Sequence, residues 1–163
     1  MPVQKAKELF NHLIMDRKQQ IETFFKVYAQ RFNDAIHGKK PDIEGVADSF
    51  ATSFIEASPV GIIAGANDKK FKEMIPKGYE FYVSTGIKTM EIISKEITFL
   101  DDRHSMVKVY WNSKYEREDA SEVTIAFDVF YLLQEINGQL KIFSYITGDE
   151  EKVLKDNGIK PYK

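Results

Sequence analysis

Residues 121–150 restrict the fold of this chain more than any other segment. They read SEVTIAFDVFYLLQEINGQLKIFSYITGDE, two long runs of aliphatic, β-branched and aromatic residues on either side of Asn137-Gly138. The Asn-Gly pair tolerates positive φ at both central positions, as a two-residue type I′ turn requires. The segment is therefore predicted to be an antiparallel β-hairpin.

A two-residue turn also predicts which side chains of the hairpin share a face. Leu132 is placed opposite Phe143, and Phe130 opposite Tyr145, because opposed residues are equally far from the turn. One face would then carry Asp128, Phe130, Leu132, Phe143, Tyr145 and Thr147, and the other Phe127, Val129, Tyr131, Leu133, Ile142, Ser144 and Ile146. Both faces are largely apolar, which is not typical of a sheet with one face in water.

Helical patterns precede the hairpin. Large apolar residues at three-to-four spacing from Ile21 to Ile36 predict an amphipathic helix that Gly38 and Pro41 end. Residues 3–15 predict a separate, shorter helix, and residues 41–50 another with Asp42 as its cap. A third helix is expected after Asn67, kinked by Pro76 and Gly78 and ended by Gly86.

Strand patterns fill most of the second half. Residues 90–100 and 105–117 predict two strands before the hairpin, joined by a turn at 101–104. Residues 52–59 are expected to be irregular or a brief strand, and residues 60–67 a loop at the rim or a packed connection. Helices followed by four antiparallel strands indicate an α+β fold, and 163 residues are expected to form one domain. Within it, 1–16 is interpreted as an N-terminal extension and 149–163 as a short C-terminal helix and tail.

Composition excludes several classes of function. The sequence has no cysteine, so neither disulfides nor thiolate metal ligands are available. Its three histidines are far apart in sequence, and we predict no metal site and no cofactor. A net charge of −2 gives no basic footprint for nucleic acid, and no apolar run is long enough for a membrane span. We expect a cytoplasmic protein that binds neither nucleic acid nor membrane.

The order of elements, Trp111 in the middle of a strand, and the run from Asp128-Val129-Phe130 through Asn-Gly to Thr147-Gly148-Asp149 together carry a family resemblance. Residues 17–150 resemble the nuclear transport factor 2-like superfamily, which includes ketosteroid isomerases, SnoaL-like polyketide cyclases and dehydratases. The resemblance implies a cystatin-like cone, in which a curved antiparallel sheet wraps around the N-terminal helices. It also implies a pocket at the open end, and dimers formed through the outer face of the sheet.

Asp128 is the one carboxylate inside the run from Val123 to Leu133. An even loop at 118–121 would place Trp111 opposite Asp128, with Tyr145 diagonally across the hairpin. Enclosure among aromatic rings would favour the neutral acid, which can donate a hydrogen bond or take part in acid–base chemistry. The resemblance places Asp128 at the donor carboxyl of the isomerases, whereas their catalytic base has no counterpart here. The alternative is a structural carboxylate satisfied by Thr147 or a tyrosine hydroxyl.

Two functions remain open from the sequence. The first is a protein that binds a small apolar or aromatic ligand in a hydrophobic pocket. The second is an enzyme of the isomerase, cyclase or dehydratase type that uses Asp128 and Tyr145 as catalytic residues. The pocket is predicted to lie between the first helix, the kinked third helix and the sheet. Its predicted lining is Tyr28, Phe32, Phe54, Tyr79 and Trp111.

A homodimer is also predicted. The hairpin face with Phe127, Val129, Tyr131 and Ile146 would leave a large apolar surface on a monomer. We expect a second copy to cover that face.

Overall fold

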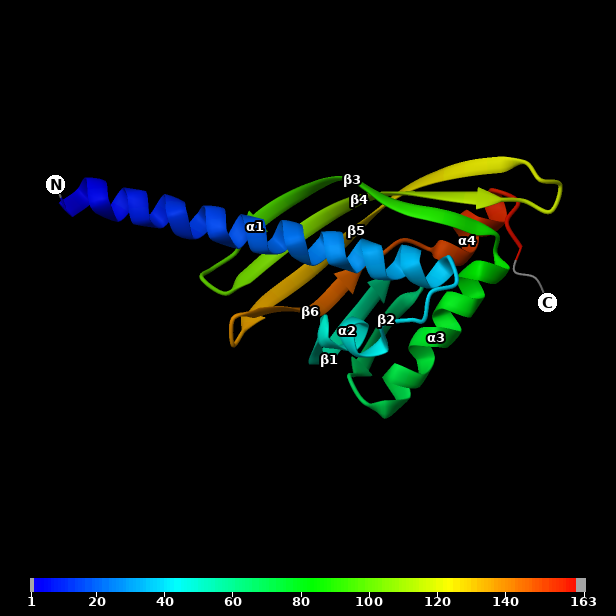
Figure 1. The fold of residues 1–163 in the computed structure, drawn as a ribbon, viewed down its shortest axis with the longest axis horizontal. Helices are drawn as coiled ribbons and strands as arrows, with labels where there is room; N and C mark the ends of the chain where they lie inside the picture. The colour runs from blue at the N-terminus through cyan, green and yellow to red at the C-terminus, as the bar shows by residue number, and fades with distance from the viewer. Residues whose placement is uncertain (1, 161–163) are drawn as a thin grey trace.

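The computed structural model describes residues 2–160. Four helices are interleaved with six strands, as Figure 1 shows. The helices are α1 (Pro2–Ile36), α2 (Ile43–Asp48), α3 (Lys69–Ser84) and α4 (Glu150–Asp156). The strands are β1 (Phe50–Ser58), β2 (Gly61–Ala66), β3 (Ile87–Phe99), β4 (His104–Glu116), β5 (Glu122–Ile136) and β6 (Gln139–Ile146). The predicted tail residues 161–163 lie outside the described range.

The strands form one curved, open sheet in the order β2-β1-β6-β5-β4-β3. Neighbouring strands are antiparallel except β1 and β6, which are parallel. Helix α1 crosses one face of the sheet, which we call the inner face, and its N-terminal part projects past the strands (Figure 1). The predicted α+β fold, with a curved sheet around N-terminal helices, is confirmed.

Helix α1 is continuous from Pro2 to Ile36, so the prediction of two separate helices was wrong. Residues 16–20 are polar, but they are all compatible with a helix, and no glycine or proline interrupts them. Ile21 and Phe25 are buried against the sheet, whereas Phe10 is 62% exposed on the projecting part.

The segment 60–67 is largely strand β2 and not a loop. It pairs with β1 in an unbroken register from Ser58–Gly61 to Ser53–Ala66. The two glycines that suggested a loop have other roles. Gly61 has φ +143 beside the turn, and a Cβ on Gly65 would lie 2.7 Å from the ring of Phe54. Glycine is required at such positions even inside a strand, because of backbone conformation and close packing.

Three short side chains cap helices, as their sequence positions suggest. Asp42 accepts a hydrogen bond from the Gly45 amide at 3.0 Å, which confirms the predicted cap of α2. Asp68 and Asp149 make the corresponding bonds for α3 and α4. Each satisfies an amide that the first helical turn leaves without a partner. Pro76 lies inside α3, and Gly86 follows the helix with φ +81.

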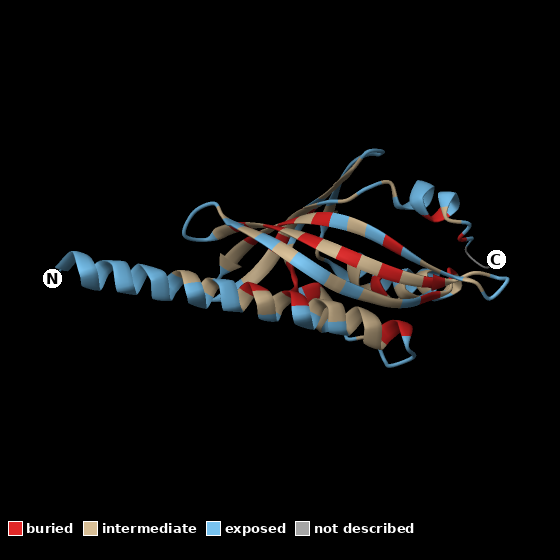
Figure 2. Cartoon of the chain, turned by 90° about the horizontal axis from the view of Figure 1, so that it is seen from above, coloured by how far each residue is buried: buried red, intermediate tan, exposed pale blue. Residues whose placement is uncertain are grey.

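Burial alternates along the central strands, as Figure 2 shows. Every second residue of β4 from Ser105 to Tyr115 is buried, and these residues point to the inner face. The main core cluster joins them to Ile21 and Phe25 of α1. A smaller cluster near the end of α1 contains Ile36, Tyr115 and Leu154.

The hairpin of β5 and β6 has the predicted turn, with φ 51 at Asn137 and φ 77 at Gly138. The predicted pairing holds from Ile136–Gln139 to Leu133–Ile142. There the register shifts by one, so that Leu132 pairs with Ser144 and Tyr131 with Tyr145. Phe143 is the extra residue of a β-bulge, and it exchanges the faces of all later residues of β6. Tyr145 is therefore an inner-face residue, on the same side as Tyr131.

The surface predicted to form the dimer was also wrong. Val129 and Tyr131 are buried on the inner face, and the Tyr131 ring lies 5.0 Å from that of Phe25 in α1. Phe127 stacks on Trp111 on the same side. Ile146, by contrast, pairs with Phe130 on the other face. Helix α1 provides the cover that the prediction assigned to a second copy.

Candidate functional site

Aromatic side chains with polar ends gather on the inner face, from five different elements. They are Tyr28 of α1, Tyr82 of α3, Trp111 and Tyr115 of β4, Tyr131 of β5 and Tyr145 of β6. Two carboxylates accompany them, Glu56 of β1 and Glu150 of α4. We call these eight residues the tyrosine network. It combines apolar walls with a few polar groups, which is the composition typical of small-molecule sites.

Tyr28, Tyr131 and Trp111 form the centre of the network. The Tyr28 ring lies 5.9 Å from Tyr131 and 6.4 Å from Trp111. The Tyr28 and Tyr131 hydroxyls are close enough for each to affect the pKa of the other. Burial raises the pKa of Tyr28 to about 12 and that of Tyr131 well above the ordinary phenol value. Both phenols are therefore neutral at physiological pH and can act as hydrogen-bond donors.

The indole N–H of Trp111 is the unusual group of this centre. Trp111 is only 2% exposed, yet its Nε1 has no hydrogen-bond partner among the described residues. It lies close enough to Tyr131 to help lower the pKa of that phenol, but without the geometry of an ordinary hydrogen bond. A buried donor without a partner is costly and uncommon in folded proteins. A ligand oxygen would satisfy it.

Tyr145 connects this centre to a carboxylate. Its hydroxyl donates to Glu56 Oε2 at 3.0 Å, and its ring lies 6.4 Å from that of Tyr131. Burial, followed by the charge of Glu56, raises the pKa of Tyr145 above its usual range. The phenol therefore keeps its proton and shares it with the carboxylate only as a hydrogen bond.

Tyr82 and Glu150 complete the network from the side of α3 and α4. Burial, followed by the charge of Glu150, raises the pKa of Tyr82 above its usual range. Glu150 as a whole residue is exposed to solvent. Its carboxylate is nevertheless partly enclosed by protein, and this burial raises its pKa from the ordinary value of 4.5. The charge of Glu56 also raises the pKa of Glu150, to a smaller extent than burial does.

Replacement of Glu150 by glutamine should alter how stability depends on pH. The raised pKa means that the folded state holds this proton more tightly than the unfolded chain does. The wild type should therefore lose stability relative to Glu150→Gln as pH rises above about 4.5, the unperturbed value. Urea denaturation between pH 4 and pH 8 measures this difference. Glu151→Gln, at the exposed neighbouring position, is the control and should show no such trend.

The predicted lining residues all lie on the helix-covered side, in connected groups. Tyr28 and Trp111 touch each other, as described above. Phe54 packs on Phe50, whose ring lies 6.2 Å from that of Tyr145. Phe32 contacts Tyr79 at 5.7 Å and Tyr82 at 5.2 Å between ring centroids, and belongs to the smaller core cluster.

Asp128 does not join this group, so its predicted place beside Trp111 was wrong. Trp111 pairs with Phe127, and Tyr110 pairs with Asp128. Asp128 thus lies on the outer face, where its side chain is 46% exposed and its carboxylate forms an ion pair with Lys108 at 3.2 Å. Tyr145, which was expected beside Asp128, bonds to Glu56 instead.

The error originates in the loop between β4 and β5. The amide of Arg117 donates to the Ser121 carbonyl, which leaves a loop of residues 118–120 in place of the even loop that was expected. Ala120 closes it with φ 64. A three-residue loop that ends in a left-handed residue is a common hairpin connection, but here alanine occupies the position that glycine usually takes. An odd loop exchanges the two faces of the following strand.

Sequence reasoning missed Glu56, Tyr131 and Glu150 as members of the network. Glu56 lies in a segment that was not assigned firmly to a strand, although Phe54 and Glu56 are spaced to share one face. Tyr131 was assigned to the outer face by the same parity error as Asp128. For Glu150 we find no signal in the sequence beyond its place after Asp149.

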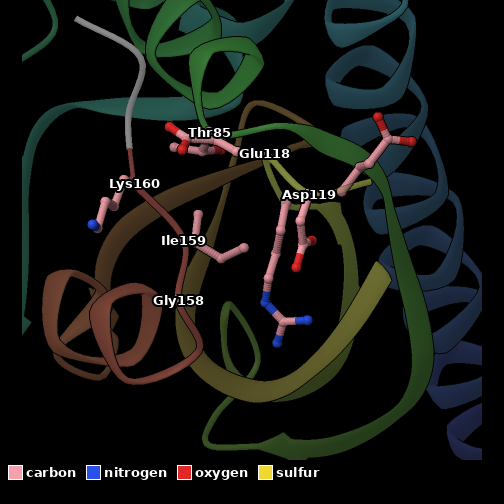
Figure 3. A pocket seen from close by; sticks show the side chains of 8 residues that line it. Thr85, Glu118, Asp119, Gly158, Ile159 and Lys160 are labelled. Atoms are coloured by element: carbon pink, nitrogen blue, oxygen red, sulfur yellow. The ribbon is translucent and has the colours of Figure 1, made fainter. Parts of the chain in front are cut away.

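The hollows found on the described residues lie away from the network, so the predicted pocket is not confirmed. One has a volume of about 220 Å³ and separates the β4–β5 loop from the segment after α4. Figure 3 shows Thr85, Glu118, Asp119, Gly158, Ile159 and Lys160 around it. The other is an open groove between α2 and α3.

Metal-binding clusters and membrane-spanning helices are both absent from residues 2–160. No group of three or more histidine, aspartate or glutamate side chains is arranged to hold a metal ion there. No helix in this range is both long enough and apolar enough to cross a membrane.

Comparison with known proteins identifies the family. The model of a family described as NTF2-like protein (DUF6841) matches residues 17–150. The chain therefore belongs to this NTF2-like family. No curated protein matches its sequence.

Solved structures agree with the family at the level of the fold. An NTF2-like protein with a cystatin-like fold from Novosphingobium aromaticivorans superposes with a TM-score of 0.68 at 7% identity, covering 91% of this chain and 96% of that one. A protein of unknown function with a cystatin-like fold from Nostoc punctiforme gives 0.54 at 20% identity, covering 80% and 89%. An NTF2-like protein of unknown function from Shewanella oneidensis gives 0.59 at 17% identity, covering 82% and 99%.

Proposed function

We propose that this protein binds a small, flat apolar or aromatic molecule against the tyrosine network. Rings of the network would contact the faces of the ligand, and the buried donors would bind an oxygen atom on it. Glu150 is the exposed member of the group, so the side of Tyr82 and Glu150 is the natural approach.

The unpartnered N–H of Trp111 carries this proposal. It lies beside the Tyr131 hydroxyl, and two neighbouring donors can bind one carbonyl or hydroxyl oxygen. Burying such donors without a partner costs about 1–3 kcal/mol. A ligand that supplies the missing acceptor recovers part of that cost as affinity.

A test uses 2-naphthol, a flat aromatic molecule with a single oxygen, and isothermal calorimetry. Replacement of Tyr131 by phenylalanine should weaken its binding about five- to tenfold, because one hydrogen bond is lost. Tyr110→Phe is the matched control, since Tyr110 is a tyrosine of the outer face that donates to Glu96. Equal affinity in wild type, Tyr131→Phe and Tyr110→Phe, or no binding at all, would contradict the proposal.

A second candidate function is acid–base catalysis of the isomerase, cyclase or dehydratase type. The sequence assigned it to Asp128 and Tyr145, and those catalytic roles stay predictions. The hydrogen bond between Tyr145 and Glu56 supports a different pair. Glu56 would take a proton from a carbon next to a carbonyl, and the Tyr145 hydroxyl, which donates to Glu56 in the free protein, would turn to donate to the oxygen.

Hydrogen exchange at the carbon next to the carbonyl of 2-tetralone, followed by NMR in D₂O, distinguishes the two functions. If the protein is an enzyme of this type, it should accelerate exchange, and Glu56→Gln should reduce the rate at least a hundredfold. Glu96→Gln provides the control, because Glu96 forms the corresponding tyrosine pair on the outer face. Binding without exchange would leave the ligand-binding function alone.

The cytoplasmic location remains a prediction, and so does self-association. The surface that the sequence assigned to a dimer is covered by α1.

A further inference from the structure

Strand β2 ends the sheet with a free backbone edge. The Asn67 amide donates to the carbonyl of Thr52 in β1. Because antiparallel ladders alternate, Gly61, Ile63 and Gly65 turn their backbone groups toward β1. Ile62, Ala64 and Ala66 therefore turn their amides and carbonyls outward, away from the sheet.

The two edges of the sheet differ in how they are protected. The edge strand β3 has two register irregularities, near Lys88 and near Ile93, and carries several charged side chains. Bulges and charges are the usual means by which an edge strand avoids pairing with another chain. Strand β2 has neither, since its register is unbroken and residues 57–67 contain no charge.

The same strand is also exposed and apolar. Ile62 is 77% exposed and Ile63 66%, and Val60, just before the strand, is 79% exposed. An uncharged, regular and apolar edge is a template for the addition of a further strand. Unlike β3, the β2 edge therefore has no feature that would stop a strand of another chain from pairing with it.

We propose that β2 pairs antiparallel with β2 of a second copy of this chain, about a two-fold axis at Ala64. Only outward-turned residues can exchange hydrogen bonds, and in this register Ala64 is opposite Ala64 and Ile62 is opposite Ala66 of the second copy. This register uses all three outward residues of each strand. The absence of charge from residue 57 to residue 67 favours a second copy, because self-pairing then brings no like charges together.

This arrangement joins the two sheets at their β2 edges and leaves each tyrosine network in place. It is independent of the proposed ligand and can be tested without one. It also differs from the dimer predicted from the sequence, which used a sheet face.

The test places charges on the two-fold axis. In Ala64→Lys or in Ala64→Glu, identical charges would lie opposite each other, and the dissociation constant of the dimer should rise about tenfold or more. A one-to-one mixture of the two variants should dimerise again, because lysine then faces glutamate. Sedimentation velocity of the full chain over a range of concentrations measures all three samples. Ile93→Lys, on the opposite edge, is the control and should leave the wild-type dimer unchanged.

Three results would overturn the proposal. The first is a wild-type chain that stays monomeric up to high micromolar concentration. If such a monomer co-sedimented with anionic vesicles, the apolar edge would bind a membrane and not a second copy, and the proposal would equally be wrong. The second is a dimer that both Ala64 variants keep at wild-type strength. The third is a mixture of folded Ala64→Lys and Ala64→Glu that remains monomeric. Circular dichroism of each variant checks the fold.

Discussion

Replacement of Phe25 by alanine should lower the free energy of unfolding by about 3–5 kcal/mol. Phe25 is fully buried where α1 crosses the sheet. Its ring lies 5.0 Å from that of Tyr131 and 5.1 Å from that of Phe24. Truncation leaves a cavity between helix and sheet in addition to the lost burial. Urea denaturation followed by circular dichroism measures the change.

Phe10→Ala is the matched control, since it removes the same atoms from the same helix. Phe10 is 62% exposed on the projecting part of α1, so its replacement should change stability by less than about 0.5 kcal/mol. Equal losses in the two variants would contradict the view that α1 is held by the part that crosses the sheet and not by its projecting N-terminal part.

Gly86→Ala should destabilise the protein by about 2–4 kcal/mol. Gly86 has φ +81, and a Cβ there would lie 2.2 Å from the Glu116 carbonyl oxygen. The Gly86 carbonyl also accepts a hydrogen bond from the Glu116 amide at 2.9 Å, which holds the two backbones together. Neither the backbone strain nor the clash can be relieved without loosening the connection between α3 and the end of β4. Thermal and urea denaturation both report this loss.

Gly78→Ala serves as its control and should have the opposite sign. Gly78 lies inside α3, and nothing is within 4 Å of its expected Cβ. Alanine is favoured over glycine in a helix by about 0.5–1 kcal/mol, so this variant should be slightly more stable than the wild type. A loss of stability in Gly78→Ala similar to that in Gly86→Ala would show that neither φ nor the space for a Cβ determines how these substitutions affect stability.

The fold could be predicted because its strongest signals are local. Asn137-Gly138 specified the turn, Asp42 the cap of α2, and the apolar stripe from Ile21 the part of α1 that packs on the sheet. The N-terminal half of α1 and the strand β2 were harder to predict from the sequence. A polar but helix-compatible stretch does not end a helix, and the glycines of β2 reflect a turn and the Phe54 ring.

The candidate site could be predicted only in part. The face of the sheet on which a side chain lies depends on whether the preceding loop or bulge adds an odd or an even number of residues. One left-handed alanine at 120 and one bulged residue at 143 each exchanged the faces of a strand. Trp111 and Tyr145 nevertheless lie on the same side, whereas Asp128 moved to the outer face. The place of Glu56 in the site could not be predicted for a different reason. It meets Tyr145 through the parallel pairing of β1 with β6, and no local pattern specifies a contact between segments so far apart in sequence.

The outer face provides an internal comparison for the site. Tyr110 and Glu96 form a hydrogen bond of 3.1 Å there, almost the same as the 3.0 Å between Tyr145 and Glu56. Hydrogen-bond length therefore does not distinguish the two pairs. What distinguishes the inner pair is burial, which raises the pKa of Tyr145, and the nearby buried indole of Trp111.

The indole N–H signal of Trp111 gives the most direct test of the proposed ligand site. Trp111 is the sole tryptophan, so its signal in a two-dimensional ¹H–¹⁵N spectrum needs no further assignment. Addition of 2-naphthol should shift this signal, and the shift should require higher concentrations in Tyr131→Phe than in Tyr110→Phe. An indole signal that stays in place at concentrations where calorimetry shows the probe to be bound would contradict the account.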